Sequence, residues 1–167
     1  MSHGTLAALA NLCAATQPPV DVDWTGVSTD TRTLEPGQLF VGLNGPNHRG
    51  ADFVAAARER GATAAVLDRP VDDPLPQLVV DDTLTALGRI ACDWRSRFDL
   101  PLVGLTGSNG KTTVKQMLAS CLGDTALATE GNLNNAIGVP LTLLRLHPDH
   151  RFAVIEMGAN HAGEIAY

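Results

Sequence analysis

The sequence has few aromatic residues and few basic residues, and both scarcities exclude classes of partner. Aromatic residues make up 4% of the 167 residues, and 12 Lys and Arg against 18 Asp and Glu give a net charge of −6. A surface of this sign, without a run of basic side chains, is a poor partner for nucleic acid or for an anionic membrane. The sequence also lacks a signal-peptide pattern and any apolar run long enough to span a bilayer. We expect a soluble, monomeric, cytoplasmic protein.

Cysteines are also scarce. Cys13, Cys92 and Cys121 are an odd number and lie far apart in the sequence, which is unlike a disulfide framework or a zinc site. Two of them fall within apolar helical patterns, so the pattern predicts small core residues in a reducing compartment. Apolar residues make up 44% of the chain, which suffices for the core of one large domain or of one small domain and part of another.

The most informative stretch of the chain is residues 102–113, with the sequence LVGLTGSNGKTT. Its apolar start, residues 102–105, predicts a buried strand; Gly107 and Gly110 then interrupt the run, and helical spacing begins at Thr112. In this order, glycine N–H groups can curl around an anion at the positive end of a helix. The stretch therefore predicts a site for the phosphates of a nucleoside triphosphate.

Within this loop, Lys111 is suited to reach the outer phosphates as a point charge, and the Thr112 hydroxyl to ligate a bridging Mg²⁺. The loop is a shorter variant of the strict phosphate-loop pattern, because Leu105 stands where that pattern has its first glycine. A tight strand-to-helix turn with an exposed lysine is the alternative. The predicted nucleotide contacts are Gly107, Ser108, Asn109, Gly110, Lys111, Thr112 and Thr113.

The first hundred residues alternate between strand and helix patterns, which is typical of a small α/β domain. Helices are predicted at 5–12, 52–60 and from 84 onward, and strands at 38–43, 62–67 and 77–80. The helix at 52–60 is expected to point Phe53, Val54 and Ala57 inward. Because a proline at 101 separates a completed helix from a new strand, we predict a first domain at 1–99 and the start of a parallel-sheet domain at 100–167.

Two segments further along carry polar residues suited to the phosphate site. Strands are predicted at 126–128 and 152–157, with a helix at 137–146 between them. Glu156 lies near the end of the buried strand 152–157, where ligands bind in parallel sheets, so it is placed to hold magnesium beside Thr112. A glutamate at the rim that simply faces water is the alternative.

Three asparagines in four residues, Asn132, Asn134 and Asn135, are more than a turn needs. Their amides are suited to orienting a phosphate or a substrate carboxylate, although asparagine also suits a loop with unusual backbone angles. His161 is a possible polar contact near the nucleotide.

A cluster of hydroxyls closed by an arginine, Ser28-Thr29-Asp30-Thr31-Arg32, lies in the predicted first domain. Hydroxyls donate to phosphate oxygens and arginine grips them in a fork, so the cluster suits a phosphorylated ligand. A polar turn leading into Glu35-Pro36-Gly37 explains the same residues, and the sequence favours neither reading. His48 and Arg49 are expected at a loop tip in solvent.

Taken together, these motifs resemble the Mur ligases. The resemblance rests on TGSNGKTT at 106–113, GNLNNAIGVP at 131–140 and EMGAN at 156–160 with Gly163-Glu164-Ile165. The segments STDTR and PGQLFV, at 28–32 and 36–41, are similar to the N-terminal domain of that family. The asparagine-rich and EMGAN blocks resemble more narrowly the members that add a dipeptide. One departure is Ala51, where many relatives carry histidine.

The resemblance implies an ATP-dependent amide ligase of peptidoglycan synthesis that adds D-alanyl-D-alanine to UDP-N-acetylmuramoyl-tripeptide through an acyl phosphate. It implies that Lys111 and Glu156 act in catalysis, that Thr112 and Glu156 hold Mg²⁺, and that residues 1–99 bind the UDP end of the substrate. The substrate contacts it implies are Ser28, Thr29, Asp30, Arg32, Asn132, Asn134 and Asn135.

Members of this family are much longer than 167 residues, and this chain stops about midway through the central domain. We therefore expect the 167 residues alone not to ligate. Two other functions remain open. One is a phosphate-loop kinase or NTPase, which would need no carboxyl acceptor. The other is a non-catalytic nucleotide-sugar-binding module, whose affinity for its ligand would not depend on Lys111.

Overall fold

The structure, a computed structural model, describes residues 2–15 and 20–159. The described residues form two compact units, divided between Ile90 and Ala91 inside a long helix. Both units are built on parallel β-sheets with helices, which confirms the predicted α/β fold class. The assignment of residues 1–99 to a substrate-binding domain stays a prediction. No helix among the described residues is both long enough and apolar enough to cross a membrane.

A four-stranded parallel sheet, in the order β3-β4-β5-β6, forms the centre of the first unit. Its strands are β3 (Val27–Ser28), β4 (Leu39–Val41), β5 (Ala64–Leu67) and β6 (Gln77–Val79). A small antiparallel pair consists of β1 (Gly4–Thr5) and β2 (Asp23–Trp24). The helical elements are α1 (Leu6–Cys13), the 3-10 turn η1 (Gly50–Phe53), α2 (Val54–Glu59) and the start of α3 (Thr83–Ser96).

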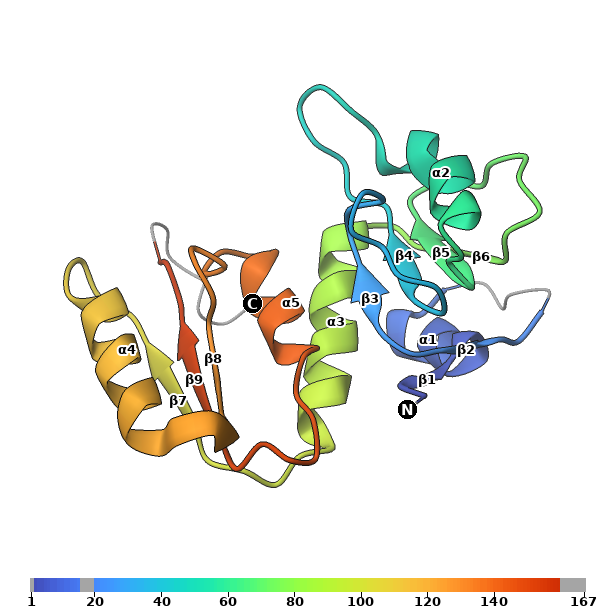
Figure 1. Cartoon of the computed structure of the whole chain (residues 1–167). Helices are drawn as coiled ribbons and strands as arrows, with labels where there is room; N and C mark the ends of the chain where they lie inside the picture. Colours follow the sequence, from blue (N-terminus) through green and yellow to red (C-terminus); the bar gives the residue numbers. More distant parts are fainter. Residues whose placement is uncertain (1, 16–19, 160–167) are drawn as a thin grey trace. The chain divides into compact units, whose positions relative to one another are not determined.

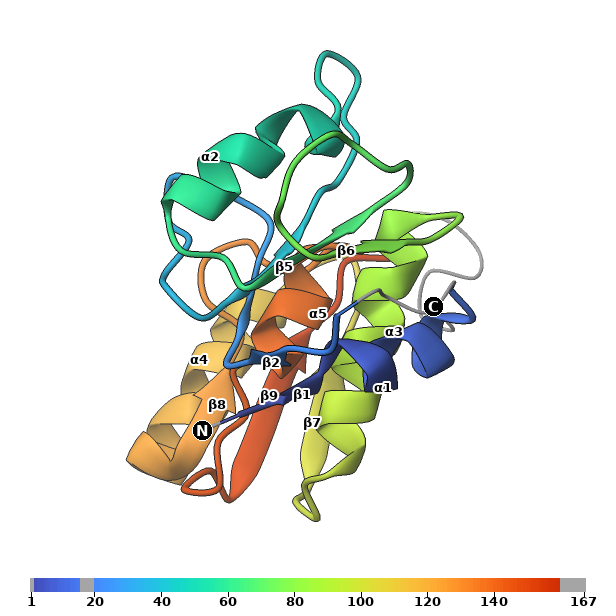
Figure 2. The ribbon, with the colours of Figure 1, turned by 90° about the vertical axis from the view of Figure 1, so that its right-hand side faces the viewer.

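Helix α2 covers one face of this sheet, and α1 with the start of α3 lies on the other (Figure 1; Figure 2). All four residues of β5 are buried, as a strand covered on both faces requires. Side-chain caps fix where two helices begin. The Thr5 hydroxyl accepts from the N–H of Ala8, and Asp82 accepts from the N–H of Thr85 at 2.6 Å. The predicted strands of this unit are confirmed with shorter bounds, and the predicted helices are confirmed with ends that differ by one or two residues.

The orientation predicted for Phe53 is wrong. Val54 and Ala57 are buried as expected, but the Phe53 side chain is 41% exposed. The reason is that a 3-10 turn, η1, precedes α2, so Phe53 does not continue the inward face of that helix. Its ring instead packs edge-on against the exposed His48 ring, and the centroids of the two rings are 6.1 Å apart.

The second unit contains a three-stranded parallel sheet in the order β7-β9-β8. Its strands are β7 (Leu102–Leu105), β8 (Ala126–Ala128) and β9 (Phe152–Glu156). Its helical elements are the end of α3, α4 (Lys111–Leu122), the 3-10 turn η2 (Gly123–Thr125) and α5 (Gly138–Leu143). Right-handed crossovers run in opposite directions along the sheet, so α4 and α5 lie on opposite faces (Figure 1).

Burial in the second unit differs from the prediction in two respects. Strand β7 was predicted to be buried, but Leu102 is 37% and Val103 is 41% exposed, because among residues 2–15 and 20–159 strand β7 has β9 on one side and no strand on the other. Of the three cysteines, Cys13 is buried, whereas Cys92 and Cys121 are exposed. The expectation of a core position is therefore wrong for Cys92 and Cys121. All three are free thiols.

A close approach of two backbone segments in the first unit generates a stability prediction. A Cβ on Gly50 would lie 2.0 Å from the carbonyl carbon of Gly42, a backbone atom that cannot rotate away. We expect Gly50→Ala to lower the free energy of unfolding by about 2 kcal/mol, as overpacking does. Chemical denaturation measures the change.

Gly26→Ala is the matched control for this substitution. Its Cβ would meet only the flexible Gln38 side chain, at 3.4 Å, so the free energy of unfolding should stay nearly constant. Equal stability losses in the two variants would contradict the role assigned to the Gly42–Gly50 contact.

Candidate functional site

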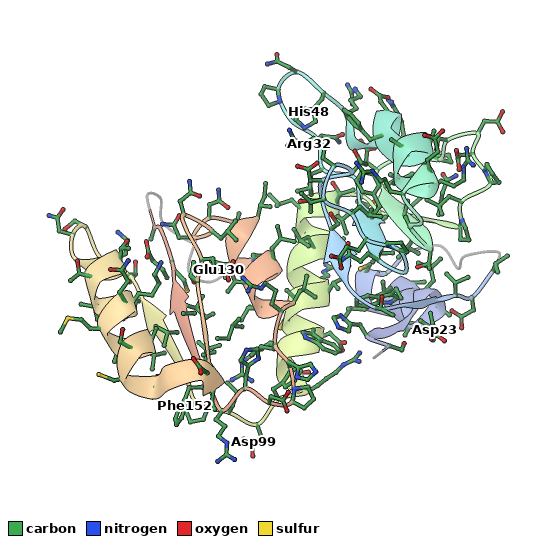
Figure 3. The ribbon with its side chains drawn as sticks, in the orientation of Figure 1. Asp23, Arg32, His48, Asp99, Glu130 and Phe152 are labelled. Carbon is green, nitrogen blue, oxygen red and sulfur yellow. The ribbon has the colours of Figure 1, made fainter. Side chains whose placement is uncertain are left out.

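The candidate site lies at the carboxyl edge of the second sheet. Strand β7 ends at Leu105 and β9 ends at Glu156, and these two residues are register partners. Figure 3 shows the polarity of the unit: Asp99 and Phe152 lie at the amino ends of the strands, and Glu130 follows β8 at its carboxyl end. The glycine loop after β7 and the Glu156 side chain therefore leave the sheet at the same edge, as predicted for a ligand site.

The glycine loop has the backbone that its sequence predicts. Gly107 has a φ of +133° and Gly110 a φ of +79°, and a Cβ on either would meet nothing within 4 Å. Gly110 precedes the first residue of α4, and no side chain caps this helix. The amino end of α4 thus faces an open loop, where an anion can accept from its first N–H groups. The Lys111 ammonium donates to the carbonyl oxygen of Gly107 across the loop.

Glu156 is the centre of a buried polar cluster. Its Oε2 accepts from the Thr112 hydroxyl at 3.0 Å and lies 3.2 Å from the Lys115 ammonium nitrogen. Its Oε1 accepts from the Asn134 side-chain amide at 2.9 Å. The residue is 3% exposed, which excludes the alternative of a glutamate facing water.

These contacts also set the acidity of Glu156. Burial by itself raises the pKa of the carboxyl group, but donation by Asn134, Lys115 and Thr112 outweighs burial, and the pKa lies below its ordinary value. Glu156 is therefore a carboxylate at neutral pH. Its backbone N–H donates to the Thr129 hydroxyl at 2.9 Å, which fixes the end of β9.

Sequence analysis missed Lys115. Its side chain is 6% exposed, and besides Glu156 it reaches the carbonyl oxygen of Gly131 at 3.5 Å. The available signal was its spacing: residues four apart share one face of a helix, so a lysine four residues after Lys111 belongs on the side of the phosphate loop.

The three asparagines have different environments. Asn134 contacts Glu156, and its backbone carbonyl accepts from the N–H of Gly158 at 2.6 Å. The Asn135 side-chain oxygen instead accepts from the backbone N–H groups of Ile137 and Gly138, at 3.1 and 2.8 Å, where α5 begins. Asn132 is exposed. The structure thus brings one of the three, Asn134, into the cluster around Glu156.

The hydroxyl and arginine cluster follows β3 in the first unit. The Ser28 hydroxyl donates to the carbonyl oxygen of Asp30 at 3.0 Å, and the Asp30 carboxylate accepts from the Arg32 guanidinium in a fork, with its shortest distance 2.6 Å. The hydrogen bonds from Arg32 lower the pKa of Asp30 to about 2. Figure 3 labels Arg32 and His48, which lie on the exposed loops after β3 and β4. These contacts order the turn and keep the guanidinium at the surface.

The donor set beside the glycine loop fits a magnesium ion. Among residues 2–15 and 20–159, no three His, Cys, Asp or Glu side chains gather into a metal site. Magnesium, however, takes one or two protein oxygens and completes its shell with water and phosphate oxygens. The Thr112 hydroxyl and Glu156 Oε2 are 3.0 Å apart, which matches the spacing of about 3.0 Å between adjacent ligands of an octahedral ion with bonds of about 2.1 Å. His161 lies outside the described residues, as do Asn160, the last residue of the EMGAN block, and Gly163-Glu164-Ile165.

The buried pair of Lys115 and Glu156 generates a stability prediction. Removing either charge leaves the other one buried without a partner, so Lys115→Met and Glu156→Gln should each lower the free energy of unfolding by about 3 kcal/mol. The double variant should lose clearly less than the sum of the two. Chemical denaturation of the four proteins gives the coupling energy directly.

The exposed pair of Arg145 and Glu130, 2.7 Å apart in the same unit, is the control. Arg145→Met should change stability by less than about 1 kcal/mol, because solvent screens this pair. Strictly additive effects of Lys115→Met and Glu156→Gln would show that the two side chains do not depend on each other.

Comparison with known proteins connects these features to a family. Residues 23–95 match a model described as "Mur ligase family, catalytic domain", and residues 105–167 match one described as "Mur ligase middle domain". A UDP-N-acetylmuramoyl-tripeptide--D-alanyl-D-alanine ligase from Escherichia coli is 48% identical over 98% of this chain and 36% of its own length. The protein of the same name from Bacillus subtilis is 45% identical over 84% of this chain and 32% of its own length.

Solved structures agree with the sequence matches. MurF from Acinetobacter baumannii has a TM-score of 0.83 and 40% identity, covering 94% of this chain and 36% of that one. MurF ligase from Thermotoga maritima, solved in complex with ADP, has a TM-score of 0.76 and 30% identity, covering 84% of this chain and 34% of that one. The chain thus spans about a third of the length of the relatives it matches. Two models of the same family cover both units, and the chain belongs to the Mur ligase family.

Proposed function

We propose that this chain carries the phosphate-binding site of an ATP-dependent amide ligase of peptidoglycan precursor synthesis. The reaction is the addition of D-alanyl-D-alanine to UDP-N-acetylmuramoyl-tripeptide, the activity named for the relatives. One observation carries the proposal: the open glycine loop at the start of α4 lies beside Thr112 and the buried Glu156 carboxylate, an arrangement suited to a triphosphate and its metal ion.

The chemistry of such a ligase places negative charge at this loop. A carboxylate oxygen of the tripeptide attacks the γ-phosphorus of ATP, ADP leaves, and an acyl phosphate forms. The amine of the dipeptide then attacks the acyl carbon, the amine loses a proton, and phosphate leaves with the C–O bond electrons. Lys111 and the amino end of α4 stabilise the phosphoryl group during the first step, because positioned positive charge is the main source of catalysis in such transfers.

Magnesium has a place in this proposal through the same residues. Thr112 and Glu156 would hold it, and it would neutralise the oxygens of the β- and γ-phosphates. Asn134 keeps Glu156 oriented by its hydrogen bond to Oε1. Since the reaction consumes ATP, we place it in the cytoplasm.

The first unit is proposed to bind the UDP end of the substrate. Ser28 ends strand β3 of a parallel sheet and Thr29, Asp30 and Arg32 follow it, at the edge where such sheets bind ligands. The Arg32 side chain is 86% exposed while its ion pair with Asp30 holds its direction, so the guanidinium can grip a diphosphate without first being ordered. Asn132 and Asn135 are proposed to contact the substrate from the second unit.

A lysine substitution tests the nucleotide site. Lys111→Ala removes the ammonium that stabilises the outer phosphates, so its affinity for ATP in the presence of Mg²⁺ should fall about 100-fold, equal to about 3 kcal/mol. Isothermal titration calorimetry measures the affinity. Arg151→Ala removes an exposed cation from the same unit and should change the affinity less than twofold. ATP binding that survives Lys111→Ala unchanged would contradict the role given to this lysine, whereas binding of the UDP-muramoyl peptide without any binding of ATP would favour the non-catalytic nucleotide-sugar-binding module.

An arginine substitution tests the UDP site. Arg32→Ala removes the fork proposed to hold the diphosphate, so the affinity for UDP-N-acetylmuramoyl-tripeptide should fall about tenfold while that for ATP stays constant. Equilibrium binding of the labelled substrate measures the first affinity, and isothermal titration calorimetry with ATP measures the second. Arg60→Ala, at an exposed arginine after α2, is the charge-matched control and should bind normally. If Arg32→Ala also binds normally, the cluster is only a polar turn.

A further inference from the structure

The chain contains two lysines, and both stand at the start of α4. Lys111 and Lys115 are one helical turn apart. Lys111 is partly exposed at the loop, whereas Lys115 is buried, and the apolar side chains of Val114 and Met117 beside it are 44% and 64% exposed. A helix that turns a lysine inward and a methionine outward is not placing that lysine for hydrophobic packing. The position of Lys115 therefore calls for another explanation.

The charges around Glu156 supply one. A buried ammonium is costly, and an ion pair rarely stabilises a protein more than apolar residues of the same size would. Lys115 lies 3.2 Å from Glu156 Oε2, the same oxygen that accepts from the Thr112 hydroxyl. Thr112 and Asn134 are neutral, so the carboxylate and the ammonium cancel, and Lys111 adds one positive charge nearby. The proposed metal position thus has no net negative charge of its own.

We infer that Lys115 makes the binding of a divalent cation depend on the nucleotide. Without nucleotide, Lys115 occupies Glu156 Oε2 and compensates its charge, so a free ion gains little electrostatic energy there. The phosphates bring the missing negative charge, and the ion binds together with them. Meanwhile Lys115 keeps the carboxylate oxygen beside Thr112, so both metal ligands are already in place when the nucleotide arrives. This inference rests on the proposed function.

Lys115 is a positioning residue in this scheme, since it acts through Glu156. Its second contact, with the Gly131 carbonyl oxygen at 3.5 Å, ties α4 to the loop that carries Asn134. One ammonium thereby links the helix after β7, the loop after β8 and the end of β9. These are three of the segments that approach the carboxyl edge of the sheet.

The test measures Mn²⁺ binding by electron paramagnetic resonance, with Mn²⁺ alone and with Mn²⁺ plus a non-hydrolysable ATP analogue. The unsubstituted chain should bind Mn²⁺ with the analogue and at least about 100-fold more weakly without it. Lys115→Met and Lys115→Gln should each bind Mn²⁺ alone about 10- to 100-fold more tightly than the unsubstituted chain, the range over which groups beside metal ligands alter affinity. Lys115→Met combined with Glu156→Gln lacks the carboxylate and should lose this gain.

The results distinguish a failure of the inference about Lys115 from a failure of the proposed function. If the unsubstituted chain binds Mn²⁺ alone as tightly as with the analogue, the inference is overturned even if neither Lys115 variant folds. If the chain binds Mn²⁺ with the analogue, but a folded Lys115 variant gains no affinity for Mn²⁺ alone, the inference fails and the proposed function stands. Failure of the unsubstituted chain to bind the analogue at all overturns the proposed function and the inference with it.

Discussion

The fold of the second unit depends on the hydrogen bonds and the ion pair that one buried carboxylate receives. Glu156 ends the central strand β9, where an unpaired negative charge would be too costly to bury. Thr112 and Lys115 of α4 donate to it, and so does Asn134 of the loop after β8. Because the carboxylate needs these donors, it draws the start of α4 and the asparagine-rich loop to the end of β9. The same contacts that make the fold possible therefore assemble the candidate site.

Most of the elements were accessible from sequence because local chemistry specifies them. Gly107 and Gly110 mark the phosphate loop, and the apolar run before Glu156 marks a strand covered on both faces. The position of Glu156 at a strand end then predicts its neighbour Thr112, since parallel strands share their carboxyl edge. Here short-range pattern and sheet geometry were sufficient.

What the sequence did not reveal depends on contacts between distant segments. The spacing from Lys111 places Lys115 on the loop side of α4, but its burial follows from the ion pair with Glu156, forty-one positions later. Leu102 and Val103 are as apolar as any buried strand, yet their exposure depends on whether a neighbouring strand covers that edge of the sheet. The predicted orientation of Phe53 was wrong for a local reason. A 3-10 turn and an α-helix have different numbers of residues per turn, so the same sequence spacing points a side chain in different directions.

The pairing of Leu105 with Glu156 has an evolutionary consequence. Side chains alternate between the faces of a strand, so a single-residue insertion within β9 would turn the carboxylate toward the opposite face and away from Thr112. Length changes in the turn before Phe152 leave this alternation intact. We expect natural variation in this region to accumulate as altered loop lengths, while the spacing from the first residue of β9 to its glutamate stays constant.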